Sequence, residues 1–109
     1  MNFIIIHGVY GHPEENWFPW LKNKLTERGY EVIVPKFPTP LDQSLESWFR
    51  VFSDYESKIN EETILIGHSL GAAFVLNYLE KTNKKIKATI LAAGFHKLLG
   101  GQYDEINKS

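Results

Sequence analysis

The stretch ILIGHSLGAAFVLNYL, residues 64–79, decides how this chain folds. Its first three residues are apolar and indicate a short buried strand, and its last ten indicate an apolar helix. Between them, GHSLG at residues 67–71 fits the pattern G-x-S-x-G, in which two glycines let a strand and a helix approach closely while the serine stays exposed at the top of a sheet. Ser69 is therefore the candidate nucleophile, because the expected strand precedes the pattern and the expected helix follows it.

The composition fits one globular domain, residues 1–109, with a modest core: 43% of the residues are hydrophobic and 23% are charged. Twelve basic against thirteen acidic residues give a net charge of -1 without a basic block, so nucleic acid is not an expected partner. The absence of cysteine excludes disulfides, thiolate zinc sites and a cysteine nucleophile. Neither metal-ligand spacing nor a phosphate-binding loop is present, so no metal and no cofactor are expected.

The first residues, Met1 and Asn2, lead directly into an apolar run without a basic leader or a cleavage site. No stretch is long enough to span a bilayer. We therefore expect a cytoplasmic protein without a membrane partner.

Four apolar runs predict strands: Phe3 to Ile6, Val32 to Val34, Ile64 to Ile66 and Ala88 to Ala93. Three segments with helical spacing separate them: one with Trp17, Trp20, Leu21 and Leu25 on one face, one from Leu45 to Ile59 behind Ser44 as N-cap, and Leu70 to Leu79. This alternation predicts an α/β fold, an open parallel sheet of about four strands with helices on both faces in three layers. The aromatic residues of the helices, Trp20 among them, are expected in the core.

Five segments carry a resemblance to a known family: residues 5–8 (IIHG), 16–21 (NWFPWL), 37–41 (FPTPL), 67–71 (GHSLG) and 93–95 (AGF). The chain resembles the N-terminal part of the small α/β-hydrolase-fold serine hydrolases, the YdeN-like family that includes the retinoblastoma-binding serine hydrolase of animals. The resemblance implies an incomplete α/β-hydrolase domain and hydrolase chemistry. It also implies that the second predicted strand lies beside the first, followed by the third and the fourth.

In this fold, two backbone N–H groups stabilise the oxyanion. One belongs to the residue after the nucleophile, here Leu70. The other comes from the loop after the first strand, and Val9 in the segment His7-Gly8-Val9 is the expected donor.

The orienting acid and the base of the triad are missing from the sequence pattern. They follow the nucleophile in the order acid, then histidine, whereas His96 and Asp104 occur in the reverse order, so we do not assign them. His7 and His68 are expected to have structural roles. His12, in the loop after the first strand, is an auxiliary candidate that could approach Ser69, although a solvated loop histidine is the simpler interpretation.

Two functions remain open. The chain is either the N-terminal portion or a shortened copy of a serine hydrolase acting on a small ester, amide or thioester, or it is a catalytically inactive remnant that serves as a binding module. In both cases the strand Ala88 to Ala93 is expected at the edge of the sheet. It has no proline and no charge, so we also expect self-association through this strand.

Overall fold

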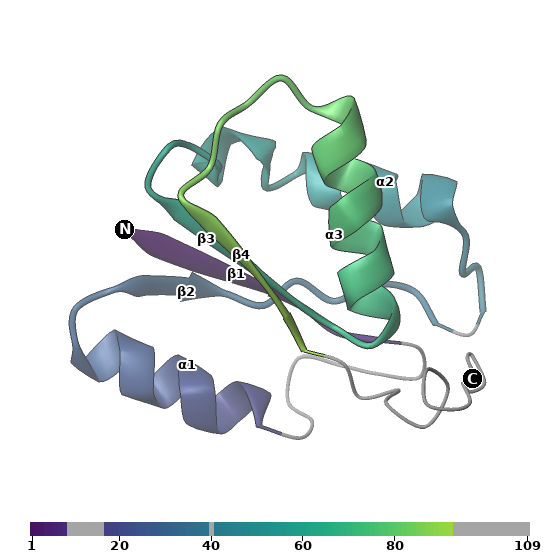
Figure 1. The fold of residues 1–109 in the computed structure, drawn as a ribbon. Coiled ribbons are helices and arrows are strands. Elements are labelled where there is room, and N and C mark those ends of the chain that lie inside the picture. The colour runs from purple at the N-terminus through teal and green to yellow at the C-terminus, as the bar shows by residue number, and fades with distance from the viewer. Residues whose placement is uncertain (9–16, 40, 93–109) are drawn as a thin grey trace, which may run out of the picture.

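The computed structural model describes residues 1–8, 17–39 and 41–92. Four strands form one parallel sheet: β1 (Asn2–Ile6), β2 (Glu31–Ile33), β3 (Thr63–His68) and β4 (Ala88–Ala92). Their order across the sheet is β2-β1-β3-β4 (Figure 1). The predicted α/β class and strand order are therefore confirmed, and β4 lies at one edge of the sheet.

Three α-helices connect the strands: α1 (Phe18–Glu27), α2 (Leu45–Ser53) and α3 (Leu70–Lys81). The predicted N-cap of α2 is confirmed, since the Ser44 side chain accepts a hydrogen bond from the N–H of Ser47 and the Ser47 hydroxyl accepts one from the N–H of Ser44. The expectation that this helix reaches Ile59 is wrong. The chain leaves the helix after Ser53 and makes a short 3₁₀ helix, η1 (Glu56–Lys58), and this turn, not the helical spacing, buries Ile59.

Successive residues of β1 point to opposite faces of the sheet, and helices cover both faces. Ile4 and Ile6 pack on the side of α2 and α3, in a cluster with Trp48, Phe52, Leu65, Phe74 and Val75. Phe3 and Ile5 pack on the other side with Ile66 and with Phe18 of α1. The predicted three layers are thus present (Figure 1). Within the described ranges, no helix is long and apolar enough to cross a membrane.

The predicted burial of Trp20 is wrong. Its side chain is 61% exposed, whereas Phe18 is fully buried. The helix begins at Phe18, and Phe18, Leu21 and Leu25 form the face that packs on the sheet. Because each residue advances the helix by about 100°, Trp20 lies roughly 200° from Phe18 and faces away from the sheet.

Hydrogen bonds hold the C-terminal end of α3 near the amino ends of the strands. The Tyr78 hydroxyl donates to Glu56 Oε2 at 2.8 Å, and Lys84 Nζ donates to the Glu56 carbonyl oxygen at 2.6 Å. Tyr78 is buried, with its ring edge-on to Phe52 at 4.9 Å. These contacts join α3 to the segment that follows α2.

Burial raises the pKa of Tyr78 from 10.0 to about 12. Between pH 10.0 and about 12 the folded protein binds more protons than the unfolded chain. The contribution of Tyr78 to the unfolding free energy is therefore fully present below pH 10 and falls as the pH rises through this window. We expect Tyr78→Phe to remove this part of the fall and to lower the unfolding free energy at neutral pH by about 1 kcal/mol, because Glu56 loses a donor. Urea unfolding at neutral and alkaline pH measures both effects. An unchanged alkaline dependence in the variant would contradict the assignment.

Candidate active site

Ser69 occupies a strained turn at the carboxyl end of β3. Its backbone has φ 59° and ψ -121°, in the left-handed half of the φ range that disfavours residues with a side chain. It takes the N-cap position of α3, but its side chain makes no capping hydrogen bond. Its backbone N–H donates to the Ala92 carbonyl oxygen at 3.0 Å, which ties the turn to β4. The backbone thus fixes the serine while its hydroxyl is not used for capping.

Two glycines, Gly67 before the serine and Gly71 after it, allow this turn. A Cβ atom added at Gly71 would overlap the carbonyl oxygen of Ile6 and lie 2.7 Å from that of His7. One added at Gly67 would lie 2.7 Å from the Gly71 oxygen. Both distances are shorter than any that real Cβ atoms adopt, so α3 begins against the end of β1 and against the end of its own preceding strand. The sequence pattern predicts this close approach.

Gly8, two residues after the end of β1, lies directly beside the serine. A Cβ atom at this position would be 2.9 Å from Ser69 Cβ and 3.3 Å from Ser69 Oγ. The backbone that leaves β1 therefore starts next to the hydroxyl, on the side from which a second backbone donor is expected. Val9 and His12, which follow Gly8, lie outside the described residues. On the helix side, α3 begins at Leu70, and the first N–H groups of a helix have no intrahelical partner.

His7 is a buried structural residue. Its Nε2 accepts a hydrogen bond from the Phe37 N–H at 2.9 Å, and its Nδ1 lies 2.9 Å from the Gly8 carbonyl oxygen. Because Nε2 is an acceptor, the neutral ring carries its proton on Nδ1 and donates it to Gly8. Its ring also packs edge-on against Phe37 and Trp48. His7 thus fixes the end of β1 to the segment after β2, as the sequence suggested.

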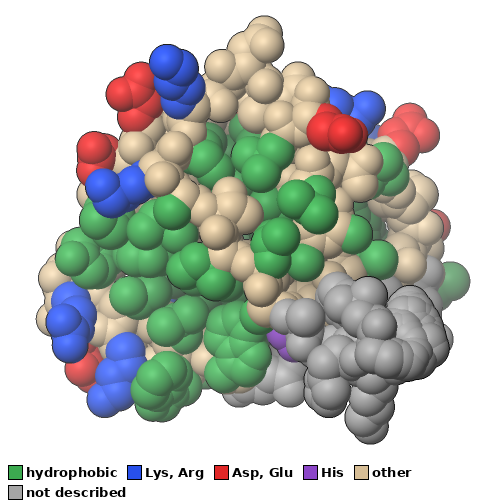
Figure 2. Space-filling view, viewed as in Figure 1, with side chains coloured by type: hydrophobic (Ala, Val, Ile, Leu, Met, Phe, Trp, Pro, Cys, Tyr) green, Lys and Arg blue, Asp and Glu red, His purple; other side chains and the backbone are tan. Residues whose placement is uncertain are grey.

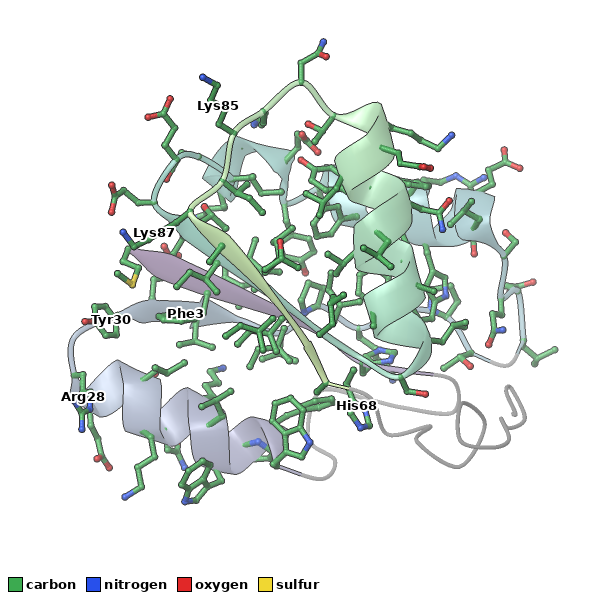
Figure 3. All side chains as sticks on the ribbon, in the orientation of Figure 1. Phe3, Arg28, Tyr30, His68, Lys85 and Lys87 are labelled. Carbon is green, nitrogen blue, oxygen red and sulfur yellow. The ribbon has the colours of Figure 1, made fainter. Side chains whose placement is uncertain are left out.

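His68 precedes the serine and lies where β3 ends, with its ring on the side of α1 (Figure 3). The ring packs edge-on against Trp17 at 5.5 Å and Phe18 at 5.7 Å. Its Nδ1 is buried and has no hydrogen-bond partner in the part of the chain that the structure describes. The packing against the start of α1 is structural. Within residues 1–8, 17–39 and 41–92, no three His, Asp or Glu side chains gather as metal ligands would.

An apolar groove of about 280 Å³ lies between α2 and α3, beside the turn. Trp48 forms its wall on α2, and Leu70, Ala73 and Phe74 form its wall on α3. The Trp48 indole N–H already donates to the Pro38 carbonyl oxygen at 2.8 Å, so this wall presents a carbon surface. The sequence did not predict this groove, although Leu45 and Leu70, two large apolar residues at the starts of helices, are a signal for it. Leu70, the residue after Ser69, lines the groove at the start of α3, whereas Ser69 itself does not line it.

Known proteins resemble this chain in sequence and in fold. Residues 3–108 match the model of the serine hydrolase family. The chain belongs to this family. It is 38% identical over 97 residues to the YdeN protein of Bacillus subtilis (strain 168), covering 87% of this chain and 51% of YdeN. It is 29% identical over 87 residues to the serine hydrolase RBBP9 of Rattus norvegicus, covering 79% of this chain and 45% of that protein.

Solved structures of hydrolases share the fold of this chain. The crystal structure of the ydeN gene product matches with a TM-score of 0.71 and 33% identity, over 93% of this chain and 55% of that one. The crystal structure of a pyrethroid hydrolase from Sphingobium faniae JZ-2 matches with a TM-score of 0.69 and 26% identity, and the match covers 86% of this chain and 40% of that one. The partial α/β-hydrolase fold is therefore confirmed. The chain spans about half the length of the curated relatives it matches.

The backbone strain at Ser69 can be measured directly. We expect Ser69→Gly to be more stable than Ser69→Ala by about 1–2 kcal/mol, because glycine adopts a positive φ freely and alanine keeps the strain. Ser53, exposed at the end of α2, is the matched control, where Gly should be less stable than Ala by about 0.5–1 kcal/mol. Urea unfolding of the four variants decides the point. The same order at both positions would show that Ser69 is not strained.

Proposed function

We propose that Ser69 is the nucleophile of a serine hydrolase that acts on a small ester, amide or thioester. The observation that carries this proposal is the strained turn: the backbone of Ser69 is fixed at the carboxyl end of the sheet, and its hydroxyl makes no cap. Ligands of open α/β sheets bind at this end. Family membership supports the chemistry. The hydroxyl would pass its proton to a base and attack the carbonyl carbon, and the bond to the alcohol, amine or thiol would break as the acyl-enzyme forms.

Two backbone N–H groups would stabilise the negative charge on the carbonyl oxygen. Leu70 supplies the first, because it begins α3 immediately after the nucleophile and the helix dipole favours negative charge there. Val9 is proposed as the second. The contact between Gly8 and Ser69 supports this assignment, because it brings the backbone that leads to Val9 beside the nucleophile.

The base must come from outside the described residues. A serine hydroxyl is a poor nucleophile unless a histidine accepts its proton. His7 uses both ring nitrogens in hydrogen bonds, and the His68 ring packs against Trp17 and Phe18. These are the two histidines within residues 1–8, 17–39 and 41–92. The base would therefore come from outside these ranges, and His12 is the auxiliary candidate for it in this sequence.

The groove between α2 and α3 supports a substrate with an apolar portion. Its walls at Trp48, Leu70 and Phe74 offer carbon surface next to the proposed oxyanion donor. An acyl or alcohol chain could lie there while its carbonyl group faces Ser69. Apolar surface buried in such a groove contributes about 25 cal/mol per Å².

A catalytically inactive binding module is the second candidate. The observation that favours it is the structural use of His7 and His68, which leaves Ser69 without a base among the described residues. A test must therefore distinguish a serine that is positioned for nucleophilic attack but lacks a base from a serine that is not positioned for attack.

Phosphonylation separates the two functions. In the reaction with an alkyl fluorophosphonate, the Ser69 oxygen forms a bond to phosphorus, fluoride leaves and the serine proton passes to solvent. We expect slow labelling of the 109-residue chain, located at Ser69 by peptide mass spectrometry and lost in Ser69→Ala. Ser53→Ala is the control and should label as the wild type does. Labelling spread over the surface serines, with no preference for Ser69, would favour the binding module.

Ester turnover by the chain should be feeble, because without a base the serine is not activated. Hydrolysis that remains in serine hydrolases after loss of the triad is about 10³- to 10⁴-fold over water and comes from the oxyanion donors and binding. Ser69→Ala should then change the rate on p-nitrophenyl esters little. Robust turnover that disappears in Ser69→Ala would contradict the missing base and would indicate His12 or a partner chain.

A further inference from the structure

His7 is a polar side chain in a place where packing alone would favour an apolar one. It is 0% exposed, and its ring lies edge-on to Phe37 and Trp48, with centroids at 5.5 and 5.7 Å. The histidine surface visible in Figure 2 therefore belongs to His68, which is partly exposed. Burying a polar group costs free energy unless it is hydrogen-bonded, so the reason for a histidine here lies in the hydrogen bonds of its ring.

The hydrogen bonds of the two ring nitrogens have different effects. The bond from the Phe37 N–H to Nε2 joins residues 30 positions apart, so it holds the segment after β2 against the end of β1. The bond from Nδ1 to the Gly8 carbonyl oxygen joins neighbouring residues, so it brings no distant segments together. It fixes instead the direction of the Gly8 carbonyl group. Because a peptide unit is planar, it also fixes the orientation of the whole unit that follows Gly8.

This peptide unit begins beside the candidate nucleophile. A Cβ atom on Gly8 would lie 3.3 Å from Ser69 Oγ and 3.1 Å from the His68 carbonyl oxygen. In a planar trans peptide, the carbonyl oxygen and the N–H of the next residue point in opposite directions. A Gly8 carbonyl that accepts a bond from the buried imidazole therefore leaves the N–H of the same unit, that of Val9, to point away from the imidazole.

We propose that His7 is a positioning residue for the second oxyanion donor. Its neutral ring, protonated on Nδ1, holds the Gly8 carbonyl group so that the N–H of Val9 faces the carbonyl oxygen of a substrate at the nucleophile. This role rests on the proposed function, because it requires Ser69 to be the nucleophile. His7 itself is buried and does not touch the substrate. A donor that is fixed before the substrate binds stabilises the developing charge without reorganisation.

Two substitutions separate the two hydrogen bonds of His7. In His7→Asn, the amide nitrogen takes the place of Nδ1 and can still donate to Gly8, but no acceptor remains for the Phe37 N–H. In His7→Gln, the amide oxygen takes the place of Nε2 and accepts from Phe37, but no donor remains for Gly8. A purely structural histidine would not make the reactivity of Ser69 depend on which bond is kept.

The rate constant for labelling of Ser69 by an alkyl fluorophosphonate is the measurement. We expect it to fall by about tenfold or more in His7→Gln, since losing an oxyanion donor outright costs about 10²- to 10³-fold. His7→Asn should label several-fold faster than His7→Gln. Tyr78→Phe is the matched control, because it loses a hydrogen bond at the other end of α3, and it should label at the wild-type rate. Urea unfolding gives the folded fraction of each variant, and the rates are compared per folded molecule.

Equal rates in the two His7 variants, or a faster rate in His7→Gln, would overturn the positioning role and leave the proposed function intact if the wild type labels at Ser69. A wild type without preferential labelling of Ser69 would overturn both. Nitrogen NMR of the wild-type chain with isotope-labelled histidine needs no variant. His7 should carry its proton on Nδ1 and none on Nε2. A proton on Nε2 would overturn the positioning role even if neither variant folds.

Discussion

The start of α3 lies so close to the end of β1 that no side chain fits between them at Gly71. The Ile6 and His7 carbonyl oxygens occupy the space that a Cβ atom would need. This contact sets the position of the helix on the sheet, and the helix in turn carries Phe74, Val75 and Tyr78 into the core. It also forces a sharp turn between β3 and α3, which only a backbone at positive φ completes. The conformation of Ser69 is a consequence of that packing.

The strain at Ser69 is offset by interactions elsewhere. His7 joins the end of β1 to Phe37, and the aromatic cluster of Phe37, Trp48 and Phe74 then packs on the same face of the sheet. A residue held at positive φ costs about 1–3 kcal/mol and persists only when the surrounding structure determines it. Here the glycine contacts fix both ends of the turn and the buried His7 fixes the end of β1 beside it, so the serine keeps an unfavourable backbone and a hydroxyl that makes no capping hydrogen bond.

Much of this arrangement follows from local sequence patterns. The apolar runs predicted the strands, and the glycines around Ser69 predicted the close approach of strand and helix. Spacing alone did not predict that Trp20 is exposed. The segment fits two helical faces, one with Trp17, Trp20 and Leu21 and the other with Phe18, Leu21 and Leu25. The residue at which the helix begins decides which face packs on the sheet. The groove beside Leu70 depends on the angle between two helices, which no local pattern records. The end of α2 at Ser53 likewise depends on the turn that buries Ile59.

The unfolding free energy of Gly71→Ala tests the central constraint most directly. Helical preference alone favours alanine by up to about 1 kcal/mol, and Ala73→Gly on the exposed side of α3 measures that preference in this protein. The packing of α3 on β1 predicts the opposite sign at position 71: a loss of about 2 kcal/mol or more, or failure to fold, because a backbone must move. A Gly71→Ala variant that unfolds at the same or a higher urea concentration than the wild type would contradict this account.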